Sequence, residues 1–285
     1  MQKTRRNLLQ LASLSPFLAL AAGIQRAEAD INRFGKTPAE AKKIAANAHH
    51  KLAANPDLQM HGSEEIAMLV YPKMTMLDMV GPQFFFKAMM GTKVHLVTKD
   101  PTLKPIMGDT GFAIVPTMSM EDCPKDLDIL FVGGGTAGTV DVMSDQTSID
   151  FVADRGSRAK HVTSVCTGSM ILGQAGLLDG KKATSHWSIR HLLSDFGATP
   201  INARVVQDGN VTTGAGVSAG LDFALTLLEQ LRGTAYAQTV QLAAEYAPEP
   251  PLKGGTPEST PSEIREPMHA MYSEFILAAQ SAIAN

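Results

Sequence analysis

One cysteine lies where a predicted strand gives way to a predicted helix, the position in this sequence best suited to covalent chemistry. Residues 161–165 read as a buried strand, Cys166 follows at once, and residues 167–170 open a helix. The free N–H groups of a helix N-terminus favour an anion and lower the pKa of a thiol. The position predicts a low-pKa, nucleophilic thiolate at Cys166, although free cysteines often serve only as packing residues.

Two further polar features follow predicted strands. Asp78 lies in the loop after the apolar strand 66–71, and the run Gly133-Gly134-Gly135 follows the strand 128–132. In open α/β sheets, sites gather beyond the carboxyl ends of the strands. We therefore expect Asp78 and the glycine run to converge on Cys166.

Both features also have structural interpretations. An acidic residue shortly before a helix is commonly an N-cap, and Gly81-Pro82 predicts a helix start just after Asp78. The glycine run can be a tight turn, and no acidic ribose ligand follows it as in a dinucleotide fingerprint. It therefore predicts a pocket of backbone N–H groups rather than a cofactor site. No histidine or cysteine group has metal-ligand spacing, so neither a metal nor an organic cofactor is predicted.

The elements that must position these residues alternate between strand and helix. Such alternation predicts a doubly wound, mostly parallel sheet with helices on both faces. A small hairpin is expected at 103–116, and Asp208-Gly209-Asn210 predicts a second hairpin turn. The predicted strands are 66–71, 93–98, 128–132, 161–165, 182–184, 204–207 and 211–213, and the predicted helices are 81–90, 146–158, 167–176, 186–196 and 217–231.

The predicted catalytic domain covers residues 65–247, and a different composition follows it. Residues 248–261 are rich in proline and glycine, and the segment 262–284 has apolar residues at helical spacing. We expect this last helix, within a tail of residues 248–285, to pack on the domain or on the second subunit of a homodimer.

Composition sets broad limits on the partners. The chain has 285 residues, 44% hydrophobic and 19% charged, which suits one globular domain with additions. A formal net charge of −3 gives no electrostatic reason to expect nucleic acid, and no apolar run suits a membrane span in the mature form. The two cysteines, Cys123 and Cys166, could form a disulfide, but a core of this size does not need one.

The N-terminus has the features of an export signal. Arg5-Arg6 precedes an apolar stretch, and Ala27-Glu28-Ala29 supplies a small-residue cleavage pattern. The paired arginines are similar to a twin-arginine signal, although an amphipathic helix is an alternative. We expect residues 1–29 to be a signal peptide that directs the protein to the periplasm, and residues 30–64 to be a linker with a short helix at 38–54.

Several motifs occur in the order found in a known superfamily. They are Leu77-Asp78-x-x-Gly81-Pro82, Ile129-Leu-Phe-Val-x-Gly-Gly135 with its glycine run, Val165-Cys-Thr-Gly-Ser169, Leu177-Leu-Asp-Gly180 and Ala183-Thr-Ser-His-Trp187. Together they resemble the ThiJ/PfpI superfamily, which has the class I glutamine-amidotransferase-like, flavodoxin-like fold with the cysteine on a nucleophile elbow. The Cys-Thr-Gly and Ala-Thr-x-His-Trp combination, with the Tyr246-Ala-Pro-Glu-Pro-Pro251 tail, looks most similar to isonitrile (isocyanide) hydratases.

The resemblance implies a role for each matching residue. Cys166 would be the nucleophile, and Asp78 would hydrogen-bond its sulfur and shuttle a proton. The Thr167 hydroxyl would orient the nucleophile or a water molecule. His186 would lie nearby, although a packed core histidine is an equal alternative. The predicted anion and substrate pocket consists of the Thr167 N–H with Gly134, Gly135, Gly168 and His186.

The sequence also departs from some relatives. Peptidase-like members have a histidine after the cysteine where this chain has Thr167, and deglycase-like members have glutamate where it has Asp78. The resulting hypothesis is cysteine-dependent hydration of a small-molecule isonitrile to an N-substituted formamide. Another cysteine-dependent activity (glyoxalase, deglycase or amidase), a redox sensor and a ligand-binding module stay open as alternatives.

Overall fold

The computed structural model describes residues 37–284, which divide into two units. The predicted export signal lies outside these residues. The described part of the first unit, residues 37–58, contains helix α3 (Pro38–Ala53), as predicted. Thr37 caps this helix by accepting the Glu40 N–H, while the Glu40 carboxylate accepts the Thr37 N–H at 3.0 Å. No residue of α3 is buried.

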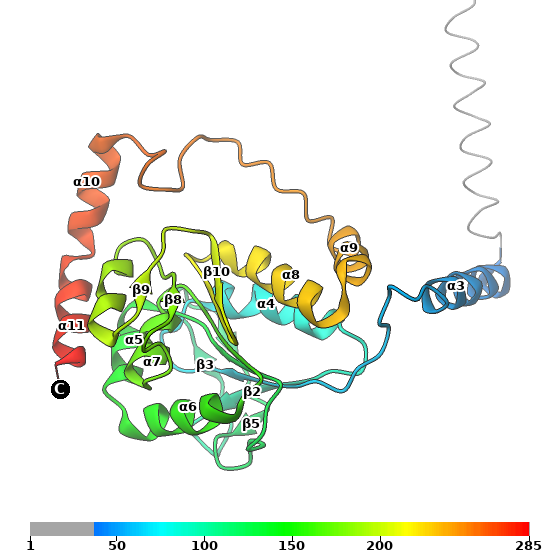
Figure 1. Cartoon of the computed structure of the whole chain (residues 1–285), viewed down its shortest axis with the longest axis horizontal. Helices are drawn as coiled ribbons and strands as arrows, with labels where there is room; N and C mark the ends of the chain where they lie inside the picture. The colour runs from blue at the N-terminus through cyan, green and yellow to red at the C-terminus, as the bar shows by residue number, and fades with distance from the viewer. Residues whose placement is uncertain (1–36, 285) are drawn as a thin grey trace, which may run out of the picture. The chain divides into compact units, whose positions relative to one another are not determined.

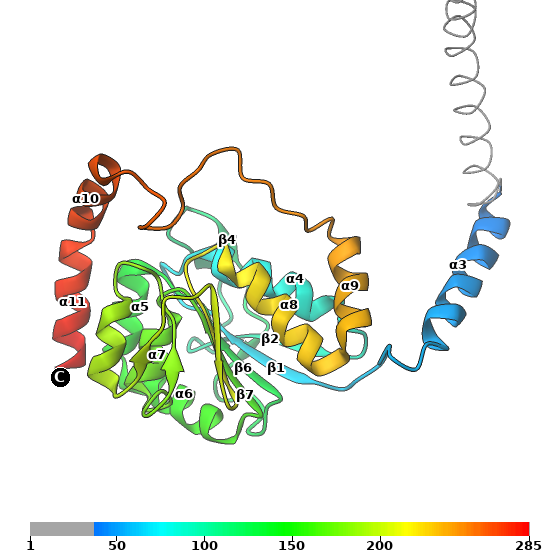
Figure 2. The ribbon, with the colours of Figure 1, turned by 45° about the horizontal axis from the view of Figure 1, so that its top comes forward.

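The second unit, residues 59–285, is built on a seven-stranded sheet in the order β10-β11-β7-β6-β1-β2-β5 (Figures 1 and 2). Every neighbouring pair is parallel except β10 and β11, which form the predicted hairpin. The strands are β1 (Glu65–Leu69), β2 (Lys93–Thr98), β5 (Met118–Ser119), β6 (Ile129–Val132), β7 (His161–Val165), β10 (Val205–Asp208) and β11 (Val211–Gly214).

Helices cover both faces of this sheet, which confirms the predicted doubly wound fold (Figures 1 and 2). Helices α4 and α8 pack together on one face, and α5, α6 and α7 lie on the other. The helices are α4 (Met76–Ala88), α5 (Thr136–Met143), α6 (Gln146–Arg158), α7 (Gly168–Gln174), α8 (Ala219–Arg232), α9 (Thr234–Ala243), α10 (Ser262–Met271) and α11 (Ser273–Ile283), with a 3-10 helix η1 (Arg190–Phe196).

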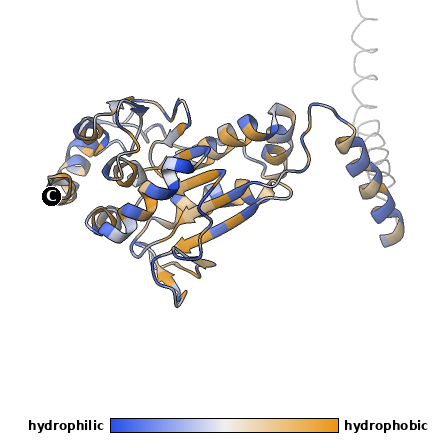
Figure 3. Ribbon diagram, turned by 60° about the horizontal axis from the view of Figure 1, so that its bottom comes forward, coloured by the Kyte–Doolittle hydropathy of each residue, from blue (hydrophilic) through white to orange (hydrophobic). Residues whose placement is uncertain are grey.

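The central strands are apolar because helices enclose them on both sides (Figure 3). All four residues of β6 are buried. Phe131 of β6 contacts the rings of Phe86 from α4 and Phe223 from α8, with centroids 6.1 and 5.8 Å apart. This aromatic cluster fixes α4 and α8 on the sheet. Among residues 37–284, no helix is long and apolar enough to cross a bilayer.

A buried ion pair ties the start of β1 to the end of α8. Arg232 is 1% exposed, and its guanidinium donates to both carboxylate oxygens of Glu64, with an Nε–Oε1 distance of 2.7 Å. The same guanidinium donates to the carbonyls of Gln59 and Met90, each at 3.2 Å. One cation thus joins three segments that lie far apart in the sequence.

Helix α4 begins earlier than the sequence predicted. Gly81-Pro82 indicated a helix start, because proline favours the first helical turn. Instead α4 starts at Met76 and carries Pro82 in its interior. The preceding turn is helical because Met76 and Met79 bury their side chains there. Asp78 is consequently in the first helical turn, not in a loop.

Other departures concern short or weakly signalled elements. Helices α5 and α9 and strand β5 were not predicted. The predicted 186–196 helix is the shorter 3-10 helix η1, and the predicted 262–284 helix is two helices that meet at Tyr272. The hairpin expected at 103–116 is present as β3 (Ile106–Met107) and β4 (Ala113–Ile114), while β8 (Lys182–Ala183) pairs in parallel with β9 (Thr199–Pro200).

Candidate active site

Cys166 lies between β7 and α7 with a φ of +59°, a conformation that non-glycine residues rarely adopt. Its N–H donates to the Ala215 carbonyl at 2.7 Å. Gly168 allows the following turn to approach β6, because a Cβ there would lie 2.2 Å from the Val132 carbonyl oxygen. The predicted elbow is therefore present, and strained backbone of this kind is concentrated at functional sites.

Asp78 lies beside the thiol and is fully buried. Its Oδ2 accepts the Gly134 N–H at 2.9 Å, and no nitrogen or oxygen donor of the described residues reaches Oδ1. Burial raises the pKa of this carboxyl to about 7, although hydrogen bonds from Gly134 and the Cys166 thiol oppose the shift. The structure thus brings Asp78 and Cys166 together, as expected, and the Asp78 carboxyl has a pKa near neutrality.

The Cys166 thiol is not the acidic group that its place at a helix N-terminus predicted. Burial raises its pKa well above the usual range, and the Asp78 carboxylate raises it further. The N–H groups of Thr167 and Val217, which hydrogen-bond the sulfur, act in the opposite direction. Desolvation and a neighbouring negative charge outweigh these N–H groups, so the prediction of a low pKa is wrong.

The Thr167 hydroxyl is fully occupied by hydrogen bonds. It donates to the Gly135 carbonyl and accepts the Gly135 N–H, both at 2.9 Å, and lies 2.7 Å from the Thr139 hydroxyl. The predicted role in orienting the nucleophile is therefore indirect. Thr167 fixes the glycine turn that holds Asp78, and its backbone N–H, rather than its side chain, contacts the sulfur.

The predicted anion pocket is arranged differently from the expectation. The Gly134 N–H is bound to Asp78 and the Gly135 N–H to Thr167, so neither is free for a substrate. Val217, which sequence reasoning missed, supplies the second N–H at the sulfur. The signal available for it was Gly214-Ala-Gly216, which leads the chain into α8 close to the elbow.

A cavity of about 230 Å³ opens on the thiol. His186 lines it, as the resemblance implied, and burial lowers the pKa of its ring to about 4, so that it is neutral at pH 7. Its Nδ1 lies 2.8 Å from the Ser188 hydroxyl. The lining residues are Thr75, Asp109, Gly135, Thr136, Cys166, Thr167, His186, Val217, Tyr272 and Phe275.

Several lining residues were not predicted. Thr75 precedes α4 and donates from its hydroxyl to Asp109 Oδ2 at 2.5 Å, which forms a polar wall. Tyr272 and Phe275 come from the C-terminal helices and form an aromatic wall. Only the helical spacing of Phe275 was visible in the sequence, and that spacing does not indicate which surface the helix covers.

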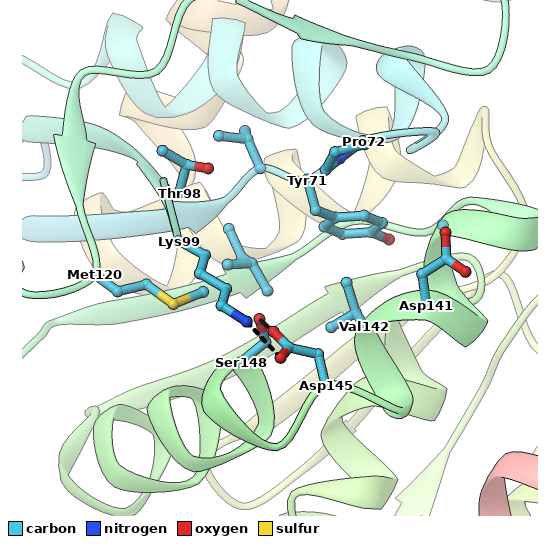
Figure 4. Close-up of a pocket in the computed structure, with 12 residues that line it drawn as sticks. Tyr71, Pro72, Thr98, Lys99, Met120, Asp141, Val142, Asp145 and Ser148 are labelled. Atoms are coloured by element: carbon cyan, nitrogen blue, oxygen red, sulfur yellow. Dashed lines mark hydrogen bonds and ion pairs between the residues drawn. The ribbon is translucent and has the colours of Figure 1, made fainter. Parts of the chain in front are cut away.

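A second cavity of about 230 Å³ lies beyond β1 and β2, near α5 and α6 (Figure 4). Lys99 and Asp145 form an ion pair of 2.6 Å in its wall. Tyr71 also lines it, and the Tyr71 hydroxyl donates to the Gly133 carbonyl at 2.8 Å. This cavity lacks Cys166, so it does not hold the reactive pair.

The described residues contain two free cysteines and no cluster of potential metal ligands. Residues 37–284 contain no cluster of three or more histidine, cysteine or acidic side chains that could hold a metal. Cys123 and Cys166 are both free and buried. The pKa of Cys123 is raised by burial, and its carbonyl accepts a hydrogen bond from Arg155 at 2.9 Å.

The chain is similar to characterised proteins over most of its length. The sequence profile of the DJ-1/PfpI family matches residues 64–230. An isonitrile hydratase from Pseudomonas putida is 47% identical over 200 residues, which are 70% of this chain and 86% of that protein. A crystal structure of a ThiJ/PfpI family protein from Pseudomonas syringae is 49% identical, with a TM-score of 0.79, and the match covers 81% of this chain and 96% of that one. Drosophila melanogaster DJ-1beta shares the fold at 21% identity, with a TM-score of 0.59 over 66% of this chain and all of that one.

Proposed function

Since this chain belongs to the DJ-1/PfpI (ThiJ) family, we propose that it is an enzyme that hydrates an isonitrile, R–NC, to the formamide R–NH–CHO. The observation that carries the proposal is the direct interaction of the Cys166 thiol with the buried Asp78 carboxyl at the base of a small cavity. The similarity to the P. putida isonitrile hydratase supports this substrate class.

The first step adds the thiol to the isonitrile carbon. That carbon accepts a soft nucleophile, and the Cys166 sulfur forms the new C–S bond. The thiol proton passes by way of Asp78 to the same carbon, which gives the thioimidate R–N=CH–S–Cys166. Because a carboxyl whose pKa is about 7 can both accept and return a proton near neutral pH, Asp78 suits this transfer.

The second step consumes water. Asp78 takes a proton from a water molecule as the water oxygen adds to the C=N carbon, and passes that proton to the nitrogen, giving R–NH–CH(OH)–S–Cys166. Breakage of the C–S bond then releases R–NH–CHO, while the hydroxyl proton returns to the sulfur. One water is consumed and no oxidant, reductant or organic cofactor enters the balance. The covalent route divides one hard hydration into two easier steps.

The N–H groups of Thr167 and Val217 give the sulfur a place to carry negative charge during both steps. These N–H groups oppose the effect of burial on the thiol pKa. Once Asp78 has taken the thiol proton and is neutral, they can stabilise the sulfur as a thiolate. We expect proton transfer by Asp78 to contribute roughly 10²–10⁴-fold to the rate.

A formamide assay on the purified full chain tests the proposal. Formation of N-cyclohexylformamide from cyclohexyl isocyanide, followed by NMR, is expected for the wild type and for Cys123→Ala, and not for Cys166→Ala. Cys123→Ala is the matched control, because it removes the other buried thiol. Turnover of methylglyoxal or of an amide without hydration of any isocyanide would overturn the proposal in favour of another cysteine-dependent activity.

We also propose that the protein works as an exported homodimer. The support for export is the pair Arg5-Arg6 with Ala27-Glu28-Ala29 in the sequence. The support for a dimer is an apolar stripe on α4, formed by Leu77, Val80 and Phe84, which are 53%, 40% and 50% exposed. Exposed apolar stripes of this kind are typical of subunit interfaces.

A further inference from the structure

The cavity over Cys166 has two chemically different ends. The reacting end consists of Cys166 and Thr167, with Asp78 buried behind them. Tyr272 and Phe275, whose rings lie 6.5 Å apart, form an aromatic part of the cavity wall. Burial raises the pKa of Tyr272, and the charge of the Cys166 thiolate raises it further. A small molecule that binds in this cavity over the sulfur thus has these rings in its wall.

The aromatic wall is held in place by two sets of contacts. The Tyr272 ring lies 5.4 Å from His186 and 5.6 Å from Trp187, so it is packed against the segment that precedes η1. Helix α11 packs on α5, and Ala279 and Ala282 are its buried residues (Figure 2). Helix α5 begins at Thr136, which itself lines the cavity. The helix that carries Phe275 therefore packs on an element that also forms part of the cavity.

The charges of the cavity favour an uncharged ligand. Its lining contains no lysine or arginine, His186 is neutral at pH 7, and the acidic side chain at the cavity is Asp109, which accepts from Thr75. An anionic group would lose its hydration without gaining a cationic partner. The volume of about 230 Å³ is below that of pockets for drug-sized ligands, so the group must also be compact.

We infer that Tyr272 and Phe275 are specificity-determining residues, which contact the R group of the substrate and select a compact, neutral ring such as phenyl or cyclohexyl. The preference among isonitrile substrates rests on the proposed function. The preference among molecules that reach the Cys166 sulfur does not, because it depends only on the residues that line the cavity. An aromatic contact is worth about 0.5–1.5 kcal/mol beyond its buried area, which is roughly a two- to tenfold preference.

Alkylation of Cys166 tests the inference without requiring turnover. The rate constants for iodoacetamide and for its N-phenyl derivative are measured by peptide mass spectrometry, which separates Cys166 from Cys123. The wild type is expected to favour the N-phenyl reagent, and Tyr272→Ala and Phe275→Ala to lose about two- to tenfold of that preference. Leu277→Ala, a truncation on the same helix at a residue 63% exposed, is the matched control and should keep it.

Hydration rates provide the second arm. The ratio of kcat/KM for phenyl over methyl isocyanide should fall in Tyr272→Ala and Phe275→Ala, and 4-isocyanobenzoate should be a poor wild-type substrate. Tyr272→Phe, which keeps the ring, should retain the wild-type ratio, and Phe275→Leu replaces Phe275→Ala if the latter does not fold. Unchanged alkylation preference in both ring-removing variants would overturn the inference. A wild type that shows the preference but hydrates no isocyanide would instead overturn the proposed function.

Discussion

The backbone N–H of Gly134 donates a 2.9 Å hydrogen bond to Oδ2 of Asp78, and a Cβ at Gly134 would lie 2.9 Å from that oxygen and 2.5 Å from the Thr167 nitrogen. The carboxyl is therefore positioned by a turn that leaves no room for a side chain. One carboxylate oxygen is fixed by the glycine turn, and the other has no nitrogen or oxygen donor within residues 37–284. This division leaves Oδ1 available for the thiol or a substrate.

Asp78→Asn should abolish most of the activity without unfolding the protein. The amide oxygen of asparagine can still accept the Gly134 N–H, but the side chain can no longer carry a proton between sulfur, carbon and water. We expect turnover of cyclohexyl isocyanide to fall by about two orders of magnitude or more, with a near-normal melting temperature. Wild-type turnover in a folded Asp78→Asn protein would rule out the proton shuttle, even if Cys166 proves essential.

The stability of the protein should depend on pH through Asp78. Its pKa is about 7 in the folded protein against an ordinary value of 3.8, so folding favours the protonated form. The stability contributed by Asp78 is complete below about pH 4. It decreases by about 1.4 kcal/mol for each pH unit between about pH 4 and 7, and does not change further above that range. The free energy of unfolding by urea, measured from pH 4 to 8, should fall more steeply with pH in the wild type than in Asp78→Asn. Parallel curves for the two proteins would contradict this assignment.

Removal of the buried cation should destabilise the fold far more than removal of an exposed one. Arg232→Met leaves Glu64, itself only 12% exposed at the side chain, without its partner, so we expect a loss of about 3–5 kcal/mol. Lys73→Met is the control, because the Lys73–Asp141 pair is about 60% exposed on each side and should contribute about 1 kcal/mol or less. Urea unfolding of both variants makes the comparison, and equal losses would show that the buried pair has no special role.

A charge in the apolar stripe of α4 should separate the proposed subunits. Phe84→Glu places a carboxylate at a residue that is 50% exposed, where an interface would bury it without a partner. Light scattering coupled to gel filtration should show a dimer for the wild type and a monomer for the variant. Lys87→Glu near the end of the same helix controls for the added charge, and a wild type that is monomeric at every concentration would refute the dimer.

Replacement of Arg5 and Arg6 by lysine should stop export by the twin-arginine route. The change keeps the positive charge and alters only the chemical identity of the pair. Cell fractionation should find wild-type protein outside the cytoplasm with an N-terminus near Asp30, and the double variant inside with residues 1–29 attached. Unchanged export would leave an ordinary secretion signal as the explanation.

The sheet, the elbow and the convergence of Asp78 with Cys166 could be predicted because they depend on local patterns. Buried parallel strands appear in the sequence as continuous apolar runs, such as 129–132. A cysteine directly between such a run and a helix is expected to lie on a sharp strand-to-helix turn. The start of α4 could not be predicted, because Gly81-Pro82 is a strong local signal that the burial of Met76 and Met79 overrides.

The electrostatics of the site were beyond sequence reasoning. A helix N-terminus lowers the pKa of a thiol, and nothing in the local sequence reveals that Cys166 is buried and faces a carboxyl from another strand end. The partners of Gly134 and Gly135 likewise depend on contacts with Asp78 and Thr167, which lie far away in sequence. The aromatic wall of Tyr272 and Phe275 is a still longer-range contact, which no periodicity encodes.

The two ends of the cavity also come from parts of the chain that are under different constraints. Cys166 and Asp78 lie within residues 64–230, where the family profile matches and a substitution disturbs a packed core. Tyr272 and Phe275 lie beyond it, where α10 has no buried residue and α11 buries only Ala279 and Ala282. Substitutions at the exposed positions of these two helices should cost little stability. If the inference about Tyr272 and Phe275 holds, evolution could change which molecules this protein accepts without altering the reacting pair, and an engineer could vary the exposed positions of the last two helices in a library while leaving Ala279 and Ala282 in place.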